Sequence, residues 1–334
     1  MPDILKLAIV TPLFKGGSSS DPANHRPVSG TSNIAKVEER IIHTKVLEFL
    51  VENDLLPQKQ HGFMKQLSTL TQLICHLDNV ISLLGNHASV DVIYLDFAKG
   101  FDKLDIGLLL QRLEDIGIQG RVQQWFSAFL RGRKQRVKVN GTLSRESEVK
   151  SGVPQGTILG PLLFILYIAP LSALPLNSSI ISYADDTKLT IGRNDLDPTS
   201  LQSDLNSIYS WVSDHNMAFN GSKFKWIVYG EPTSQPLYCD TSNQPISQVS
   251  TVRDLGVTLQ CNGRYDQHIQ ERVSKASQMC GWMLRTFETR EKTPILTLYK
   301  SLILPLLDYC CYRMTAVPQT FVVCHLFWLG ISRE

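Results

Sequence analysis

The sequence predicts a mixed α+β fold, and three observations support this. Stretches with apolar residues three or four positions apart alternate with β-branched runs, as expected of helices and strands in succession. Two strand-like segments, 180–183 and 188–191, enclose a tight acidic turn. From about Gly263 onward the apolar spacing is helical, which predicts a helical C-terminal part. A chain of 334 residues, 43% of them hydrophobic, is long enough to bury a sizeable core.

Two helices and a strand are predicted before residue 96. The first helix begins after Ser32, a good N-terminal cap, and ends before Asn53. The second ends at Gly85, a residue typical of helix C-termini, and a β-branched run then predicts a strand over 90–95. The apolar faces of these helices are formed by Ile34, Val37, Ile41, Ile42, Val46 and Phe49 and by Leu70, Leu73, Leu77, Val80 and Leu84.

Further helices and a hairpin are predicted in the rest of the chain. A third helix runs from the cap residue Asp105 to Gly117, and a strand containing Val137 and Val139 enters a hairpin turn at Asn140-Gly141. Helical spacing then returns in three sets: Leu201, Leu205, Ile208 and Trp211; Ile269, Val273, Ala276, Met279, Met283 and Phe287; and Leu298, Leu302 and Leu306.

Charge and cysteine content exclude several classes of protein. A net charge of +2 is low for a compact DNA-reading domain, which is usually strongly basic. The seven cysteines are scattered without a C-x2-C pair, so neither a zinc site nor a disulfide framework is indicated. The N-terminus lacks the features of a signal peptide. These features predict an intracellular protein.

One segment allows two readings. Between Lys150 and Asp185, 34 consecutive residues carry no formal charge, and 158–176 is strongly apolar. A membrane helix is one reading. Prolines interrupt the segment, and it lacks flanking aromatic belts, so we favour a buried core helix and expect no membrane partner.

Three carboxylates form the main candidate site. Asp185 and Asp186 are adjacent in a turn between strands, where they repel each other unless cations bind them, although solvated turn carboxylates are the ordinary alternative. Asp96 directly follows the predicted strand 90–95. If that strand pairs beside the acidic hairpin, Asp96 and Asp185 can hold two Mg²⁺ ions about 3.5 to 4 Å apart, the arrangement used in nucleotidyl transfer.

Seven blocks of the sequence occur in a fixed order: Lys15 with 24–29; 60–63 with Ser68-Thr69; 95–102; 151–156 with 159–161; 183–186; Phe219-Asn220 with Lys223; and 254–257. Together these blocks resemble the reverse transcriptases of non-LTR (LINE-like) retrotransposons, close to the jockey and CR1 type. In that family the third to sixth blocks resemble motifs A, B, C and D, and the last is similar to the primer-grip region. The resemblance extends from about Leu5 to Tyr309.

This resemblance implies a right-hand polymerase with fingers, palm and thumb. It divides the chain into fingers (1–90), palm with finger insertions (91–262), a helical thumb-like region (263–312) and an atypical tail (313–334). The implied activity is extension of a DNA primer on an RNA template with dNTPs and two Mg²⁺ ions, with Mn²⁺ as an alternative. The nucleus is the implied location if the protein is active.

The resemblance also implies roles for individual residues. Asp96, Asp185 and Asp186 are the implied catalytic metal ligands, with Lys223 as a catalytic general acid for pyrophosphate. Phe101 is the implied ring that excludes a 2′-hydroxyl. The implied nucleotide- and template-binding residues are Arg26, Phe97, Phe101, Gln155 and Gly156. Ordinary alternatives remain: Phe101 as a core residue, Lys223 as a solvated lysine and Arg26 as part of a local turn.

A basic stretch beside the predicted hairpin is a candidate nucleic-acid contact, and its alternative is a solvated strand edge. The stretch comprises Arg131, Arg133, Lys134, Arg136 and Lys138, and the first four are the candidate contacts. The sequence departs from the family pattern at Gly30, Gly100 and Ala169-Pro170, and the pattern is lost after Tyr309. We expect no room for an endonuclease before the first block. These departures favour one alternative function, a catalytically inactive nucleic-acid-binding remnant. A third reading, an RNA-dependent RNA polymerase, shares the metal-binding carboxylates but would not need a bulky Phe101 against the sugar.

Overall fold

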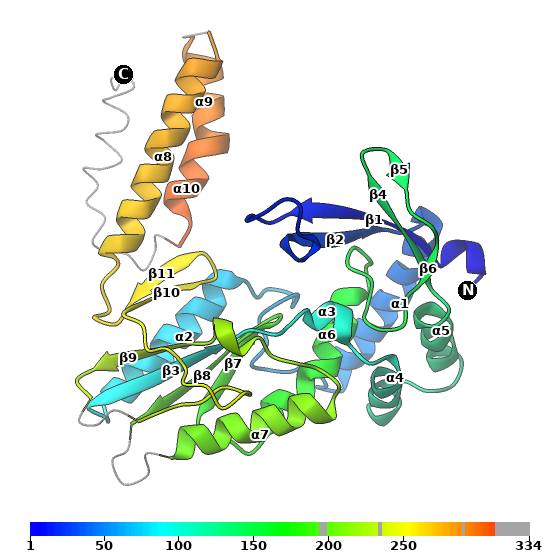
Figure 1. Cartoon of the computed structure of the whole chain (residues 1–334), viewed down its shortest axis with the longest axis horizontal. Coiled ribbons are helices and arrows are strands. Elements are labelled where there is room, and N and C mark those ends of the chain that lie inside the picture. The colour runs from blue at the N-terminus through cyan, green and yellow to red at the C-terminus, as the bar shows by residue number, and fades with distance from the viewer. Residues whose placement is uncertain (194–198, 233–235, 289–290, 311–334) are drawn as a thin grey trace. The chain divides into compact units, whose positions relative to one another are not determined.

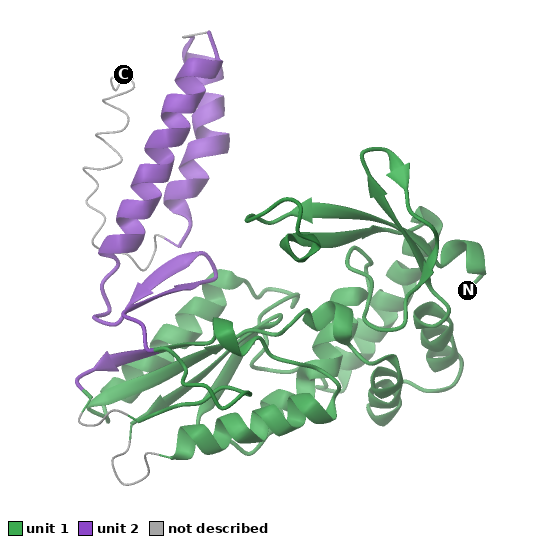
Figure 2. Cartoon of the chain, in the orientation of Figure 1, with its two compact units in different colours: residues 1–226, 232–247 green, residues 227–231, 248–334 purple. Residues whose placement is uncertain are grey.

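Helices and antiparallel strands alternate through most of the chain, as the sequence predicts. The computed structural model describes residues 1–193, 199–232, 236–288 and 291–310 (Figure 1). The chain divides into two units, which are described separately (Figure 2). Unit 1 comprises residues 1–226 and 232–247, and unit 2 comprises residues 227–231 and 248–334.

A four-stranded sheet with the order β7-β8-β3-β9 carries the candidate carboxylates (Figure 1). Its strands are β3 (Ser89–Leu95), β7 (Ser179–Tyr183), β8 (Asp186–Gly192) and β9 (Lys225–Gly230). β8 pairs antiparallel with both β3 and β7. Helix α2 (Thr69–Leu84) packs against β3, β7 and β8. Strand β3 is buried along almost its whole length, which is why its sequence reads as a near-continuous apolar run.

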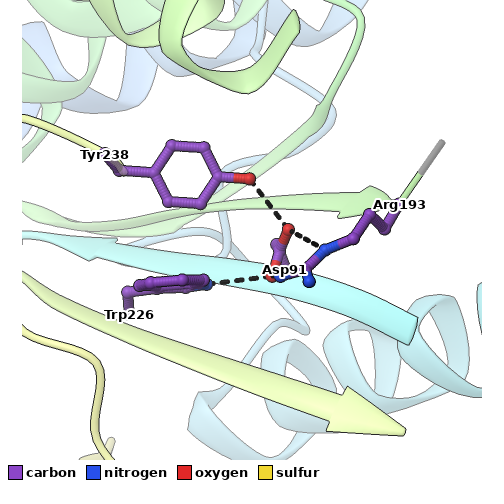
Figure 3. Close-up of polar contacts among 4 residues, drawn as sticks. All are labelled: Asp91, Arg193, Trp226 and Tyr238. Atoms are coloured by element: carbon purple, nitrogen blue, oxygen red, sulfur yellow. Dashed lines mark hydrogen bonds and ion pairs between the residues drawn. The ribbon is translucent and has the colours of Figure 1, made fainter. Parts of the chain in front are cut away.

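Asp91 is the charged exception within β3, and it is fully buried. Its carboxylate forms an ion pair with Arg193, with 2.6 Å between Nη2 and Oδ1 and 3.0 Å between Nε and Oδ2 (Figure 3). Trp226 Nε1 and the Tyr238 hydroxyl also donate to it, at 2.9 and 2.8 Å. Burial and the adjacent Asp91 charge raise the pKa of Tyr238, so this phenol stays a donor. Within unit 1, the carboxylate thus ties Arg193, Trp226 and the 236–247 segment to β3.

A second sheet lies near the N-terminus. β1 (Leu7–Phe14) pairs antiparallel with β2 (His25–Gly30) and parallel with β4 (Lys134–Val139). The short strands β5 (Thr142–Leu143) and β6 (Ser147–Glu148) both pair with β4. The hairpin at Asn140-Gly141 was predicted, whereas β1 and β2 were not. Each contains a proline, and Pro12 faces Pro27 in the register, so neither strand has the usual sequence signature.

The first predicted helix is confirmed as α1 (Asn33–Glu52), but part of its predicted apolar face is wrong. Ile34, Val37 and Ile41 are 66%, 62% and 61% exposed. The buried face is instead formed by Ala35, Glu39, Val46 and Leu50. Apolar spacing predicted the helix but not which of its faces is buried, because the buried face includes a glutamate, Glu39.

The other predicted helices of unit 1 are also present. α4 (Ile106–Asp115) begins at the cap Asp105, whose carboxylate accepts from Leu108 N at 3.0 Å. α7 (Ser200–Asp214) follows the acidic hairpin. The short α3 (Gly100–Lys103) and α5 (Gly120–Leu130) were not predicted.

The uncharged segment after Lys150 contains α6 (Gly160–Ile168), which is buried on nearly every side. Its N-terminus is capped by Glu39, which is itself fully buried: one carboxylate oxygen accepts from Ile158 N at 2.7 Å and Leu159 N at 3.2 Å. Burial raises the pKa of Glu39, while these backbone donors oppose the rise. The predicted buried core helix is therefore confirmed. Among the residues that the structure describes, no helix is long and apolar enough to cross a membrane.

Unit 2 combines a hairpin with a helical pair. The hairpin is formed by β10 (Thr251–Asp254) and β11 (Val257–Gln260). α8 (Asp266–Thr286) packs with α9 (Lys292–Leu298), a π-helical turn (Tyr299–Ile303) and α10 (Leu304–Asp308). The core of the helical pair is Ala276, Cys280, Met283, Ile295, Tyr299 and Ile303. The predicted helical stripe around Ala276 and Met283 is therefore confirmed as a core face. The predicted tail, 313–334, lies outside the described residues.

Candidate active site

The ends of two paired strands bring together the carboxylates of motifs A and C. In the β3–β8 ladder Leu95 faces Thr187, so Asp96 leaves β3 beside the start of β8. In the β7–β8 hairpin Tyr183 faces Asp186, which leaves Ala184 and Asp185 as a two-residue turn. The predicted pairing of strand 90–95 with the acidic hairpin is thus confirmed.

Burial and nearby charges perturb the pKa of Asp185, which the strand pairing places beside Asp96. Burial is the largest effect on Asp185 and raises its pKa, a backbone hydrogen bond opposes the rise, and the Asp96 charge raises the pKa further. Arg26 and Lys15 lie near enough to lower it. Because the Asp96 charge disfavours the ionised form of Asp185, a cation bound between the two carboxylates would relieve the repulsion.

The donor set fits a hard divalent ion such as Mg²⁺, which prefers carboxylate oxygens. Asp186, the third predicted ligand, is exposed at the start of β8. Across residues 1–193, 199–232, 236–288 and 291–310, no three His, Cys, Asp or Glu side chains cluster closely enough to hold a metal ion. The structure therefore brings Asp96 and Asp185 together and does not bring Asp186 into a three-ligand cluster with them.

The motif D segment lies directly against motif A. Ala98 N donates to Ala218 O and Asn220 N donates to Asp96 O, both at 2.8 Å. This pairing places Lys223 Nζ 3.1 Å from Asp96 Oδ2, in an ion pair that is partly open to solvent. The predicted catalytic lysine and one predicted metal ligand thus share one edge of the site.

The two motif A phenylalanines have different environments. Phe97 is 4% exposed and packs on Phe219, with ring centroids 4.5 Å apart. A ring so buried offers little surface to a nucleotide, so we assign Phe97 to the packing between motifs A and D instead of to substrate contact. Phe101 is half-buried and stacks on Phe164 at 4.2 Å, with Phe63 edge-on at 6.2 Å.

The motif B loop is held between motif A and β2. Gln155 Nε2 donates to Asp102 Oδ1 at 2.9 Å, and Ser29 N donates to Gln155 O at 2.7 Å. Gly156 has a φ of +113°, and a Cβ there would lie 2.6 Å from Ser29 O. Glycine is required at this position for both reasons.

The basic stretch divides into a buried and an exposed part. Arg133 is only 3% exposed; its guanidinium donates to Phe129 O at 3.1 Å and lies over the Phe129 ring. Burial lowers its pKa and Glu39 opposes this. We therefore remove Arg133 from the candidate nucleic-acid contacts, because the guanidinium has little access to a phosphate. Arg131 and Lys134 are exposed, and Arg136 is partly exposed and donates to Ser144 O at 3.0 Å. Lys134 pairs with Glu146.

Sequence reasoning missed three residues beside motifs A and C. Lys15 contributes to its electrostatics. Gln60 hydrogen-bonds to the motif C turn, and Phe63, 58% exposed, lies against Phe101. All three occur in blocks that carry the family resemblance, but only the folded chain shows that these blocks meet motifs A and C.

Comparisons with known proteins agree with this geometry. Residues 15–259 match the family model described as reverse transcriptase (RNA-dependent DNA polymerase). The chain is 27% identical over 326 residues to the "Probable RNA-directed DNA polymerase from transposon X-element" of Drosophila melanogaster, covering 92% of this chain and 35% of that protein. It is 26% identical over 322 residues to the RNA-directed DNA polymerase from mobile element jockey of the same species, with the same coverage. The chain therefore spans about a third of the length of these relatives.

Among solved structures, the chain resembles apo telomerase from Candida tropicalis, with a TM-score of 0.58 at 11% identity, covering 97% of this chain and 59% of that one. A form of that telomerase truncated from the C-terminal domain gives a TM-score of 0.54 at 12% identity, covering 77% of this chain and 54% of that one. This likeness confirms the predicted right-hand polymerase fold. The chain belongs to the reverse transcriptase family, and within it to the LINE-like type of non-LTR retrotransposons.

Proposed function

We propose that this chain is the RNA-directed DNA polymerase part of a non-LTR retrotransposon protein and extends a DNA primer on an RNA template with dNTPs. The observation that carries the proposal is the meeting of Asp96 and Asp185 at neighbouring strand ends. Reverse transcriptases generally use divalent metal ions, and these two carboxylates fit that requirement. The proposed division into fingers, palm and thumb-like region follows the family blocks.

The proposal gives the following roles to the predicted site residues. Asp96 and Asp185, with Asp186 as a third candidate, would hold two Mg²⁺ ions, which supply stabilisation of charge on the attacking and leaving oxygens. The Lys223 ammonium, held beside Asp96, is suited to give a proton to pyrophosphate. Arg26 adds positive charge near Asp185 for triphosphate binding. Phe101, which is half-buried, is the proposed ring that restricts the ribose 2′ side.

Primer extension by the purified chain tests the proposal, with an RNA template, a labelled DNA primer, Mg²⁺ and either dNTPs or rNTPs. Asp185→Asn should abolish extension, and the exposed control Asp115→Asn should not. Because burial and Asp96 raise the pKa of Asp185, its ionised form costs stability at neutral pH. The variant should therefore melt no lower than wild type in EDTA.

The outcomes separate the candidate functions. Extension with dNTPs that Asp185→Asn removes supports the proposal. Binding of primer and template without extension by wild type would identify an inactive remnant, and preferential use of rNTPs would identify an RNA polymerase. Near wild-type extension by Asp185→Asn would overturn the assignment of the metal site.

A further inference from the structure

We propose that Gln60 is a positioning residue that fixes the backbone of the motif C turn and so holds Asp185 in place. This inference rests on the proposed function, because Asp185 is its proposed metal ligand. Gln60 lies between α1 and α2, more than a hundred residues before the turn, and is 3% exposed. Its sequence block, 60–63, gave no indication of contact with motif C.

The Gln60 side chain satisfies both backbone groups of Ala184. Ala184 N donates to Gln60 Oε1 at 2.7 Å, and Gln60 Nε2 donates to Ala184 O at 3.1 Å. The same Oε1 accepts from Gly62 N at 2.8 Å, which anchors the amide to its own loop. The residues before and after Gln60 also bind β7: His61 N donates to Ser182 O, and Ser182 N donates to Lys59 O, both at 2.9 Å. Residues 59–62 therefore extend the sheet beside β7 and end at the turn.

The turn requires such a support because its backbone is strained. Ala184 has a φ of +55°, a left-handed conformation that is unfavourable for a residue with a side chain because its Cβ crowds the neighbouring carbonyl oxygen. It is the first residue of a two-residue hairpin turn, a position where glycine or asparagine is usual. Such a conformation persists when surrounding contacts over-determine it. Gln60 supplies two of those contacts, both on the residue immediately before Asp185.

Close packing around Gly62 strengthens the same conclusion. A Cβ on Gly62 would overlap the backbone nitrogen of Ala184, so the two backbones meet without an intervening side chain. The contact needs a donor and an acceptor on one side chain of this length. Glutamate would lose the donor and add a charge near Asp185 and Asp96, and methionine would fill the space with no strong hydrogen bond.

The test compares wild type, Gln60→Met and the double variant Gln60→Met/Ala184→Gly. Gln72→Met is the matched control, because Gln72 is also a fully buried amide beside β8 but binds Lys188 Nζ and not the turn. Primer extension gives kcat and the KM for dNTP, and fluorescence anisotropy gives primer–template affinity. Hydrogen exchange over residues 180–188, followed by mass spectrometry, reports on the turn without requiring activity.

Gln60→Met should lower kcat at least tenfold, with primer–template affinity within twofold of wild type, and should speed exchange in 180–188 at least tenfold. Ala184→Gly should restore part of kcat, at least threefold, because glycine adopts a positive φ without the penalty. Gln72→Met should leave kcat within threefold. Unchanged hydrogen exchange and unchanged kcat in Gln60→Met would overturn the inference. It would also be overturned if kcat fell only in proportion to the fraction of folded protein and the double variant with Ala184→Gly did not recover it. If wild type does not extend primers, the proposed function fails, while the exchange measurements still decide whether Gln60 fixes the turn.

Discussion

Replacing Asp91 by asparagine should destabilise unit 1 strongly without touching the proposed active site. The Asp91 carboxylate accepts four hydrogen bonds, two from Arg193 and one each from Trp226 and Tyr238 (Figure 3). Asparagine keeps the size of the side chain but has one acceptor oxygen, and its NH₂ group would face donors. It also removes the charge that balances the Arg193 guanidinium.

The expected magnitude follows from burial. The side chains of Asp91 and Arg193 are 1% and 5% exposed, so solvent does little to compensate for the loss of the pair. Removing one partner of a buried ion pair typically costs about 3 to 5 kcal/mol. For a unit of this size, about 2 to 4 °C of melting temperature is lost per kcal/mol, so a fall of roughly 6 to 20 °C is expected.

Chemical denaturation at pH 7 and thermal melting measure this loss. The matched control is Asp3→Asn, which removes the partner of Lys6 in an ion pair whose carboxylate is 97% exposed and should change stability by less than about 0.5 kcal/mol. A loss below about 1 kcal/mol in Asp91→Asn would refute the reasoning, because it would mean that the buried carboxylate contributes no more than a surface one.

Three further predictions concern the sugar site, the basic hairpin and unit 2. Phe101→Val should raise the incorporation of rNTPs relative to dNTPs at least tenfold, equivalent to about 1.4 kcal/mol of relieved clash. If steady-state kinetics show that rNTP and dNTP incorporation fall equally, Phe101 is a core residue, which its stacking on Phe164 also allows. The double variant Lys134→Ala/Arg136→Ala should reduce the slope of log affinity for primer–template against log salt concentration by roughly one to two. An unchanged slope would mean that both side chains lie on a solvated strand edge and do not contact nucleic acid. His268 Nδ1 accepts a hydrogen bond from Thr258 N, and burial lowers the pKa of His268 to about 4. Between about pH 6.5 and 4 the unfolded chain therefore binds a proton at His268 that the folded chain does not, so the free energy of unfolding falls as the pH is lowered through this range. His268→Gln should make the free energy of unfolding less dependent on pH between pH 7 and 4.5. A variant whose pH dependence is identical to that of wild type would contradict the assignment.

The sequence by itself determined the secondary structure that carries the site. Strand 90–95 and the acidic hairpin were readable because their residues are β-branched and bounded by polar turns, and these local preferences survive in the fold as β3, β7 and β8. Asp96 and Asp185 were candidates because strand ends next to a turn place carboxylates side by side once the strands pair. The helical face around Ala276 and Met283 was readable for the same kind of reason, since helix periodicity is local.

Only the tertiary structure decided which surfaces these elements bury. It turned Ile34, Val37 and Ile41 outward and placed Glu39 inside, where that residue caps the N-terminus of α6. It buried Arg133, which sequence spacing had grouped with its exposed neighbours. It also brought Gln60 to Ala184, across more than a hundred residues. Such contacts depend on how distant segments pack, and the composition of a short window carries no information about its distant partner.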